Sequence, residues 1–119
     1  MMNEAKRMLV KGIVRHSVFP LNSPVVLCQK GDGSVRFAID FRKVDKVTRK
    51  EPYPIPRIDD SLNSLGGGKL FTTLDLESAY WQVPLDEASI EKTAFSIPGV
   101  GHLEFVVMPY GLSNAGSCF

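Results

Sequence analysis

Residues 69–85 read KLFTTLDLESAYWQVPL, and the first eight of them alternate as a buried β-strand does. One face of this predicted strand carries Leu70, Thr72, Leu74 and Leu76. The opposite face ends at Asp75, and a turn through Glu77–Trp81 follows. The sequence therefore places a carboxylate at the end of an apolar strand.

A carboxylate in this position suits a hard cation, because rigid backbone fixes its place. Magnesium prefers oxygen ligands and commonly takes one or two carboxylates together with substrate phosphates. The same local pattern fits equally well an Asp75 that only caps the turn into Glu77–Trp81. Tyr80 lies close enough to Asp75 in the sequence for its aromatic ring to pack against the sugar of a bound nucleotide. For Trp81, core packing is the preferred interpretation.

Short elements are predicted on both sides of this stretch. A helix begins at Asn3 and stops before Gly12, and another begins near Arg57 and ends at the Gly66-Gly67-Gly68 run. Strands are predicted at Val25–Lys30, Val35–Phe41, Lys92–Ile97 and Leu103–Val107, with helical tendencies at Arg42–Lys50 and from Leu112. Hairpins and helices mix without a regular strand-helix-strand repeat, so the predicted fold class is α+β rather than doubly wound α/β.

The first two of these strands form a predicted hairpin with a Gly-rich tip, residues 31–34. Val35, Phe37, Ile39 and Phe41 would share its core face. A two-residue turn sets Lys30 opposite Val35, and a three-residue loop sets it opposite Arg36. Both cations could clamp a triphosphate, but the pattern alone favours a solvated hairpin edge.

The charge is strongly divided although the net value is only +1. Residues 1–50 hold eleven Lys/Arg against four Asp/Glu, and residues 51–119 hold three against nine, giving +7 and −6. Gln29–Lys50 alone carries +4, which suits phosphate-backbone contacts but also fits a merely solubilising loop.

Composition excludes several classes of protein. The chain has 119 residues, 44% of them apolar and 23% charged, which fits one globular domain or part of a larger one. Its two cysteines offer no disulfide framework or zinc spacing, so an intracellular, reduced protein is predicted. Its apolar runs fall far below the roughly 20 residues of a membrane span.

Four stretches in this order resemble the reverse transcriptase of gypsy-type long-terminal-repeat retrotransposons and retroviruses. They are SPVVLCQKGDGSVRFAIDFRKVDKVT (23–48), YPIPRIDDSLNSLGGGKLFTTLDLESAYWQVPL (53–85), KTAF (92–95) and HLEFVVMPYGLSNA (102–115). The resemblance implies the fingers and a partial palm of a right-hand polymerase. Its divisions would be an N-terminal helix and lead-in (1–22), a fingers-like part (23–68) and a partial palm (69–119).

The resemblance also implies roles for individual residues. Asp75 would be the first catalytic aspartate and, with the carbonyl of Leu76, a ligand of two magnesium ions, with manganese an alternative. The implied nucleotide-binding residues are Lys30, Arg36, Ser78, Ala79, Tyr80 and Tyr110, with Tyr80 as the steric gate against a ribose 2′-hydroxyl. The implied nucleic-acid contacts are Arg42, Lys43, Lys46 and Gly111.

These roles predict part of an RNA-directed DNA polymerase of a retrotransposon Pol polyprotein, acting by phosphoryl transfer on a template-primer and dNTP. The family's Tyr-x-Asp-Asp hairpin, thumb and RNase H region lie outside residues 1–119, so the isolated chain is expected to be inactive. Gly116 stands where the family usually has proline. The expected location is a cytoplasmic particle or the nucleus, without membrane contact. The alternatives are a non-catalytic nucleic-acid-binding or interaction module and a relic without function.

Overall fold

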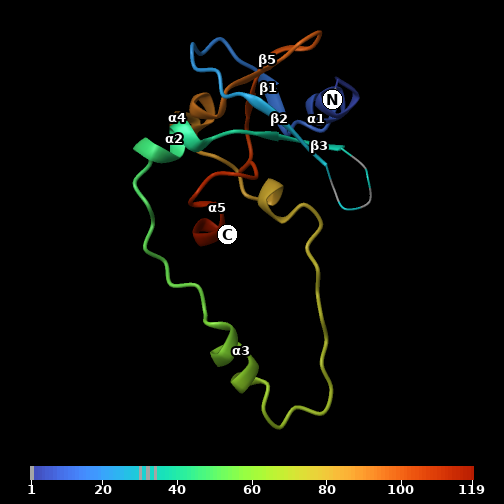
Figure 1. The fold of residues 1–119 in the computed structure, drawn as a ribbon, viewed down its shortest axis with the longest axis vertical. Helices are drawn as coiled ribbons and strands as arrows, with labels where there is room; N and C mark the ends of the chain where they lie inside the picture. Colours follow the sequence, from blue (N-terminus) through green and yellow to red (C-terminus); the bar gives the residue numbers. More distant parts are fainter. Residues whose placement is uncertain (1, 30, 32, 34) are drawn as a thin grey trace.

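The computed structural model describes residues 2–29, 31, 33 and 35–119, apart from the side chains of Val35 and Arg36. A packed body carries both termini, and an arm of residues 49–77 leaves the body and returns to it (Figure 1). The radius of gyration is 17.2 Å. A compact chain of this length would have about 13.5 Å. The arm therefore accounts for an unusually extended molecule.

The body is built on a three-stranded antiparallel sheet in the order β1-β5-β4. Its strands are β1 (Val14–His16), the central β5 (Gly101–Phe105) and β4 (Phe95–Ile97). The predictions of β4 and β5 are confirmed, although β4 is shorter than its predicted range and β5 begins and ends two residues earlier than predicted. Strand β1 was not predicted, because three residues with Arg15 and His16 exposed show no apolar alternation.

Helix α1 (Met2–Val10) covers this sheet and confirms the predicted opening helix. Its buried residues are Ala5 and Met8, which sit one turn apart and so face the core together. The core that they join also contains Val14, Ile39, Phe41, Phe95, Ile97, Leu103 and Phe105. Trp81 packs against this core, as predicted.

The hairpin pairs β2 (Val25–Gln29) with β3 (Val35–Ile39). Its core face is confirmed for Phe37, Ile39 and Phe41. Both predicted registers are wrong, because Gln29 pairs with Val35 and Cys28 with Arg36. The described pairs end at Gln29 and Val35, and Lys30, whose position both predicted registers concern, lies outside the described residues.

Short helical segments complete the body. Helix α2 (Arg42–Val47) occupies the predicted basic connector, and α5 (Ala115–Cys118) follows the predicted start at Leu112. Between them along the chain come the 3-10 turn η1 (Ala79–Gln82), α4 (Glu87–Ile90) and the 3-10 turn η2 (Glu91–Thr93). The segment after η1 is tied to the sheet, since Leu85 N donates to Val106 O at 3.0 Å and Met108 N donates to Val83 O at 2.8 Å.

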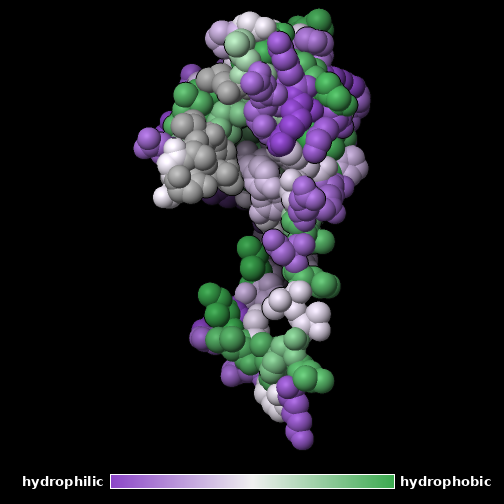
Figure 2. Space-filling model, turned by 90° about the vertical axis from the view of Figure 1, so that its right-hand side faces the viewer, coloured by the Kyte–Doolittle hydropathy of each residue, from purple (hydrophilic) through white to green (hydrophobic). Residues whose placement is uncertain are grey.

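The arm carries α3 (Ile58–Ser64), the helix predicted near Arg57, at its far end. Its apolar face is fully formed but uncovered, with Ile58 77%, Leu62 61% and Leu65 52% exposed. Figure 2 shows apolar side chains gathered over this part of the molecule. Every residue from 49 to 77 is exposed.

The predicted strand Lys69–Leu76 is wrong for this chain. Residues 70–76 run without secondary structure, and Leu70 is 94% and Leu74 90% exposed. A strand needs a neighbour to pair its backbone N–H and C=O groups. No described segment provides that neighbour, so alternation alone does not produce the strand. Among the described helices, none is long and apolar enough to cross a membrane.

Candidate functional site

The candidate site begins at the turn where the arm rejoins the body. Ser78 has φ 50° and ψ 46°, a left-handed conformation that is rare for a residue with a side chain. It redirects the chain into η1, where Trp81 N donates to Ser78 O at 2.8 Å and Val83 N donates to Tyr80 O at 3.1 Å. The turn therefore holds Ser78, Ala79 and Tyr80 in one fixed, half-buried run.

The fold brings together Tyr80 of η1 and Tyr110 of the loop after β5. Their ring centroids lie 5.1 Å apart at an interplanar angle of 48°. Phe119 approaches Tyr80 from another side at 5.7 Å, in an edge-on arrangement. Tyr110 is 47% exposed, so the pair offers an aromatic surface to solvent. Tyrosine rings of this kind can accept a planar base or a sugar edge.

Asp75 and Leu76 precede this turn on the exposed end of the arm. In the described part of the chain the Asp75 carboxylate has no hydrogen-bond or ion-pair partner, and no group of three or more potential metal ligands forms. The Asp75 carboxylate and the Leu76 carbonyl are hard oxygen donors of the kind magnesium binds. They fit part of a magnesium site and cannot complete one.

The two hairpin cations are described only in part. Lys30 lies outside the described residues, and the side chain of Arg36 is likewise not described. The backbone of Arg36 lies in β3 opposite Cys28. The triphosphate clamp predicted for Lys30 and Arg36 therefore remains a prediction.

The basic residues of α2 differ in their partners. Arg42 donates from Nε to both carboxylate oxygens of Asp40, at 2.9 and 3.0 Å, and this side-chain hydrogen bonding lowers the pKa of Asp40 to about 2. Arg42 is therefore already paired. Lys43 and Lys46 are exposed, and neither forms an ion pair with another described residue. These two lysines are the better candidates for phosphate contacts.

The loop that carries Tyr110 is fastened to α2 and the start of the arm. Ser113 N donates to Asp45 Oδ1 at 2.9 Å, and Asn114 Nδ2 donates to Arg49 O at 2.8 Å. Gly111 has φ 101°, and a Cβ there would lie 3.4 Å from Ile39 O, so a side chain would be strained. The predicted contact residues of α2 and Gly111 are thus brought into one region with Tyr110.

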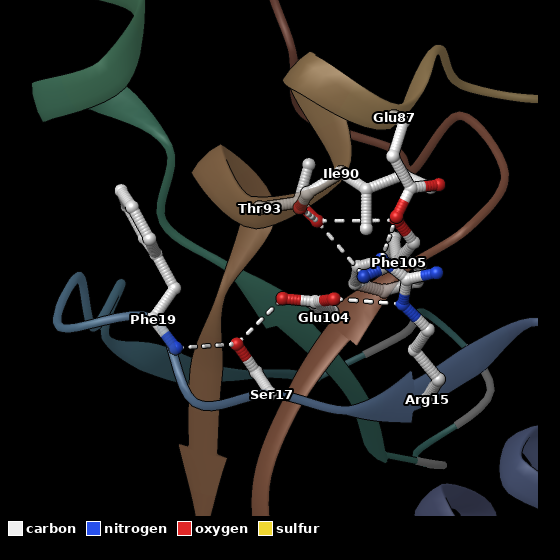
Figure 3. Close-up of polar contacts among 8 residues, drawn as sticks. All are labelled: Arg15, Ser17, Phe19, Glu87, Ile90, Thr93, Glu104 and Phe105. Carbon is white, nitrogen blue, oxygen red and sulfur yellow. Dashed lines mark hydrogen bonds and ion pairs between the residues drawn. The ribbon is translucent and has the colours of Figure 1, made fainter.

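A second polar cluster lies on the sheet and was missed by sequence reasoning. Glu104 is 6% exposed and pairs across the strands with Arg15, whose Nε donates to Glu104 Oε1 at 2.7 Å (Figure 3). Ser17 Oγ donates to Glu104 Oε2 at 2.5 Å, and Phe19 N donates to Ser17 Oγ at 3.1 Å. The cluster therefore holds the loop after β1 against β5. The signal for it was a glutamate inside the apolar run of residues 103–107.

Opposing influences act on the Glu104 carboxyl. Burial would raise its pKa, but hydrogen bonds from Ser17 and Arg15 outweigh burial and lower the pKa below the ordinary value of 4.5. The folded state therefore binds this proton less readily than the unfolded state. The stability contributed by Glu104 is complete above the unfolded-state pKa and is lost as the pH falls through the lower folded-state pKa.

We expect Glu104→Gln to lower the free energy of unfolding by about 1–2 kcal/mol near pH 7, because a charged acceptor of two hydrogen bonds is lost. The loss should shrink as the pH falls below 4.5, where the wild-type carboxylate becomes protonated. Urea unfolding across this range measures both effects. Glu87→Gln is the matched control, because Glu87 pairs with the same Arg15 from a side chain that is 76% exposed, where an ion pair contributes little to stability. Equal stability of Glu104→Gln and wild type at neutral pH would contradict the assignment.

A cavity of about 840 Å³ lies between α2, the loop after β1 and the segment before β4. Its apolar wall includes Leu21, Val44, Leu85, Met108 and Leu112. Of the predicted site residues whose side chains the structure describes, only Lys43 lines it, and Asp75, Tyr80 and Tyr110 do not. The cavity is therefore separate from the aromatic pair.

Comparison with known proteins connects these features to a family. The pattern of the family described as "Reverse transcriptase (RNA-dependent DNA polymerase)" matches residues 28–119. The Pol polyproteins of transposons 297 and gypsy from Drosophila melanogaster are 43% and 46% identical over 98% of this chain. The chain spans only 11% and 12% of their length.

Solved structures of reverse transcriptases are similar in fold to this chain. The native prototype foamy virus protease-reverse transcriptase is 26% identical, with a TM-score of 0.86 over 100% of this chain and 16% of its own. A foamy viral protease-reverse transcriptase in complex with double-stranded DNA is 25% identical, with a TM-score of 0.76 over 94% of this chain and 20% of its own.

Proposed function

Because the chain belongs to the reverse transcriptase (RNA-dependent DNA polymerase) family, we propose that residues 1–119 supply the nucleotide-facing part of a longer RNA-directed DNA polymerase. Such an enzyme adds dNTPs to a primer on an RNA or DNA template. The observation that carries this proposal is the Tyr80–Tyr110 pair, with rings 5.1 Å apart and Asp75 five residues before Tyr80. The matching polyproteins are named as retrovirus-related Pol proteins of transposons.

In this proposal the rings of Tyr80 and Tyr110 position the base and sugar of the incoming nucleotide. Main-chain groups of Ser78, Ala79 and Tyr80 line the same place, and the rigid turn keeps them aligned. Holding reactants in the productive geometry is a large part of phosphoryl-transfer catalysis. Lys30 and Arg36 would hold the triphosphate from the hairpin side.

Template-primer binding is proposed for the exposed face of α2 and the neighbouring loop. Lys43 and Lys46 form no ion pair with another described residue there, and Arg42 must share its guanidinium with Asp40. Gly111 lets the backbone approach closely. Phosphate contacts of this type give affinity that falls with salt and carry no sequence information. The DNA-bound foamy viral enzyme is a structural relative that binds a duplex.

Asp75 and the Leu76 carbonyl would hold magnesium in the longer enzyme. Bound magnesium stabilises the charge on the attacking and leaving oxygens of the transfer. One carboxylate and one carbonyl are too few ligands for two ions, so further carboxylates must come from outside residues 1–119. For this reason the isolated chain is proposed to be inactive. The divisions 1–22, 23–68 and 69–119, as lead-in, fingers-like part and partial palm, belong to the same proposal.

A grafted polymerase tests this function. We define it as the polymerase of the gypsy Pol polyprotein with residues 1–119 in place of its matching segment, which is 46% identical. We expect the graft to incorporate dNTPs on a primed template only with magnesium or manganese, and the isolated chain to incorporate none. Failure of the graft beside an active parent enzyme would contradict the function. Incorporation by the isolated chain would contradict its dependence on the longer protein.

A second candidate is a non-catalytic nucleic-acid-binding module. Two observations favour it: Lys43 and Lys46 are exposed, and no other described metal-binding residue groups with Asp75. Filter binding of RNA to Lys43→Glu/Lys46→Glu measures the contact that both candidates share, because reversing two phosphate contacts should cost at least about tenfold in affinity at low salt. The two candidates differ in whether Asp75 is needed. Lys6→Glu/Lys11→Glu is the charge control, because it makes the same change of charge on two exposed lysines elsewhere. The module is favoured if the lysine variant loses RNA binding while the Asp75→Asn variant of the grafted polymerase behaves as wild type.

A further inference from the structure

The turn that carries Tyr80 is tied to the loop that carries Tyr110 by two routes. The first is a backbone hydrogen bond, since Met108 N, two residues before Tyr110, donates to Val83 O, three residues after Tyr80, at 2.8 Å. The second is a side chain. The Trp81 ring lies against the Tyr110 ring with centroids 6.0 Å apart and an interplanar angle of 57°. Trp81 therefore stands between the turn and the loop.

Two features of this turn are costly for stability. Ser78 holds a left-handed conformation at φ 50°, which glycine would adopt without strain. The Trp81 Nε1–H is buried and finds no hydrogen-bond acceptor among the described residues. A buried donor without a partner loses its hydration and gains nothing in return. Both features flank Tyr80 in the sequence, and strain of this kind clusters at functional sites.

The unpaired N–H indicates what Trp81 contributes. A phenylalanine would pack against the same core without burying a donor, so hydrogen bonding does not explain the indole. Its greater width does, because the ring must reach both the core and Tyr110. The tryptophan thus adds the contact with Tyr110 at the expense of a buried polar group.

We propose that Trp81 is a positioning residue that sets the spacing of the Tyr80 and Tyr110 rings for the base and sugar of a deoxynucleoside triphosphate. This role rests on the proposed function of the aromatic pair. Trp81 does not touch the nucleotide itself. It fixes the distance between two rings that do, through its contact with Tyr110 and the backbone of η1.

Steady-state kinetics of the grafted polymerase test this role. We expect Trp81→Phe to raise the KM for dNTP about tenfold and to weaken discrimination against rNTP, while kcat stays within about twofold. Ile97→Val is the control, because it loses one buried methyl group away from both tyrosines and should leave the KM and discrimination unchanged. A KM for Trp81→Phe equal to that of Ile97→Val overturns the role.

Measurements on the 119-residue chain need no polymerase. Trp81 is the only tryptophan, so its fluorescence reports this contact alone. We expect Tyr110→Leu to make the indole markedly more accessible to acrylamide and Trp81→Phe to leave the urea midpoint near wild type. Unchanged quenching, or a midpoint far below that of Ile97→Val, overturns the role. A graft that is inactive with Trp81 in place overturns the proposed function and this role together, whereas an active graft isolates the role.

Discussion

Asp75→Asn is expected to lower dNTP incorporation by the grafted polymerase by at least about 1,000-fold, because in the proposed function the substitution removes a charge that would bind metal in the transition state. Asparagine keeps the shape of aspartate and one oxygen but loses the negative charge. The loss should appear in kcat rather than in template affinity. Single-turnover incorporation, measured beside template binding, separates the two quantities.

Folding should not change in the same variant. Asp75 is exposed and has no partner among the described residues, so its replacement removes no intramolecular contact. We expect the urea unfolding curve of the 119-residue chain to be superimposable on that of wild type. Glu77→Gln is the matched control, since it neutralises an exposed carboxylate two residues away. A graft that tolerates Asp75→Asn as well as Glu77→Gln would remove Asp75 from the catalytic site.

Sequence patterns predicted the elements that are locally determined. The opening helix, the hairpin strands and α3 were found where period and capping residues placed them, because each depends on its own side chains. The core face of the hairpin was also predictable, since Phe37, Ile39 and Phe41 alternate with polar residues. The resemblance to reverse transcriptases then supplied the family.

Features that depend on distant partners were not predictable. The register of the hairpin, in which Gln29 pairs with Val35, was not specified by the glycines of its tip. Strand β1 exists because β5 offers a free edge, and Arg15 pairs with Glu104 only after that strand has formed. The contact of Trp81 with Tyr110 likewise joins residues between which β4 and β5 lie in the sequence.

The strand predicted at residues 69–76 does not form, and it too shows that a local pattern is not enough without a partner. Its alternation is strong, yet the segment remains exposed because its backbone has no described neighbour. The apolar face of α3, the helix before it, is likewise well formed but covered by no described residue. Both patterns therefore indicate burial in a larger protein. The relatives, of which this chain spans 11–12%, are long enough to provide it.

Leu62→Ser/Leu65→Ser tests this idea by its effect in two settings. In the 119-residue chain both side chains are already more than half exposed, so the free energy of unfolding should change by less than about 0.5 kcal/mol. In the grafted polymerase the same residues would be covered by the remaining protein. Truncating two buried leucines there should cost about 4 kcal/mol or more and abolish incorporation at the working temperature.

The comparison needs a variant that alters α3 without touching its apolar face. Asp60→Ser/Asn63→Ser meets this need, because both residues lie away from the stripe formed by Ile58, Leu62 and Leu65. We expect it to behave as wild type in both settings, by urea unfolding of the chain and thermal inactivation of the graft. A leucine variant as stable as this control in the graft would mean that the apolar face of α3 stays exposed in the longer protein.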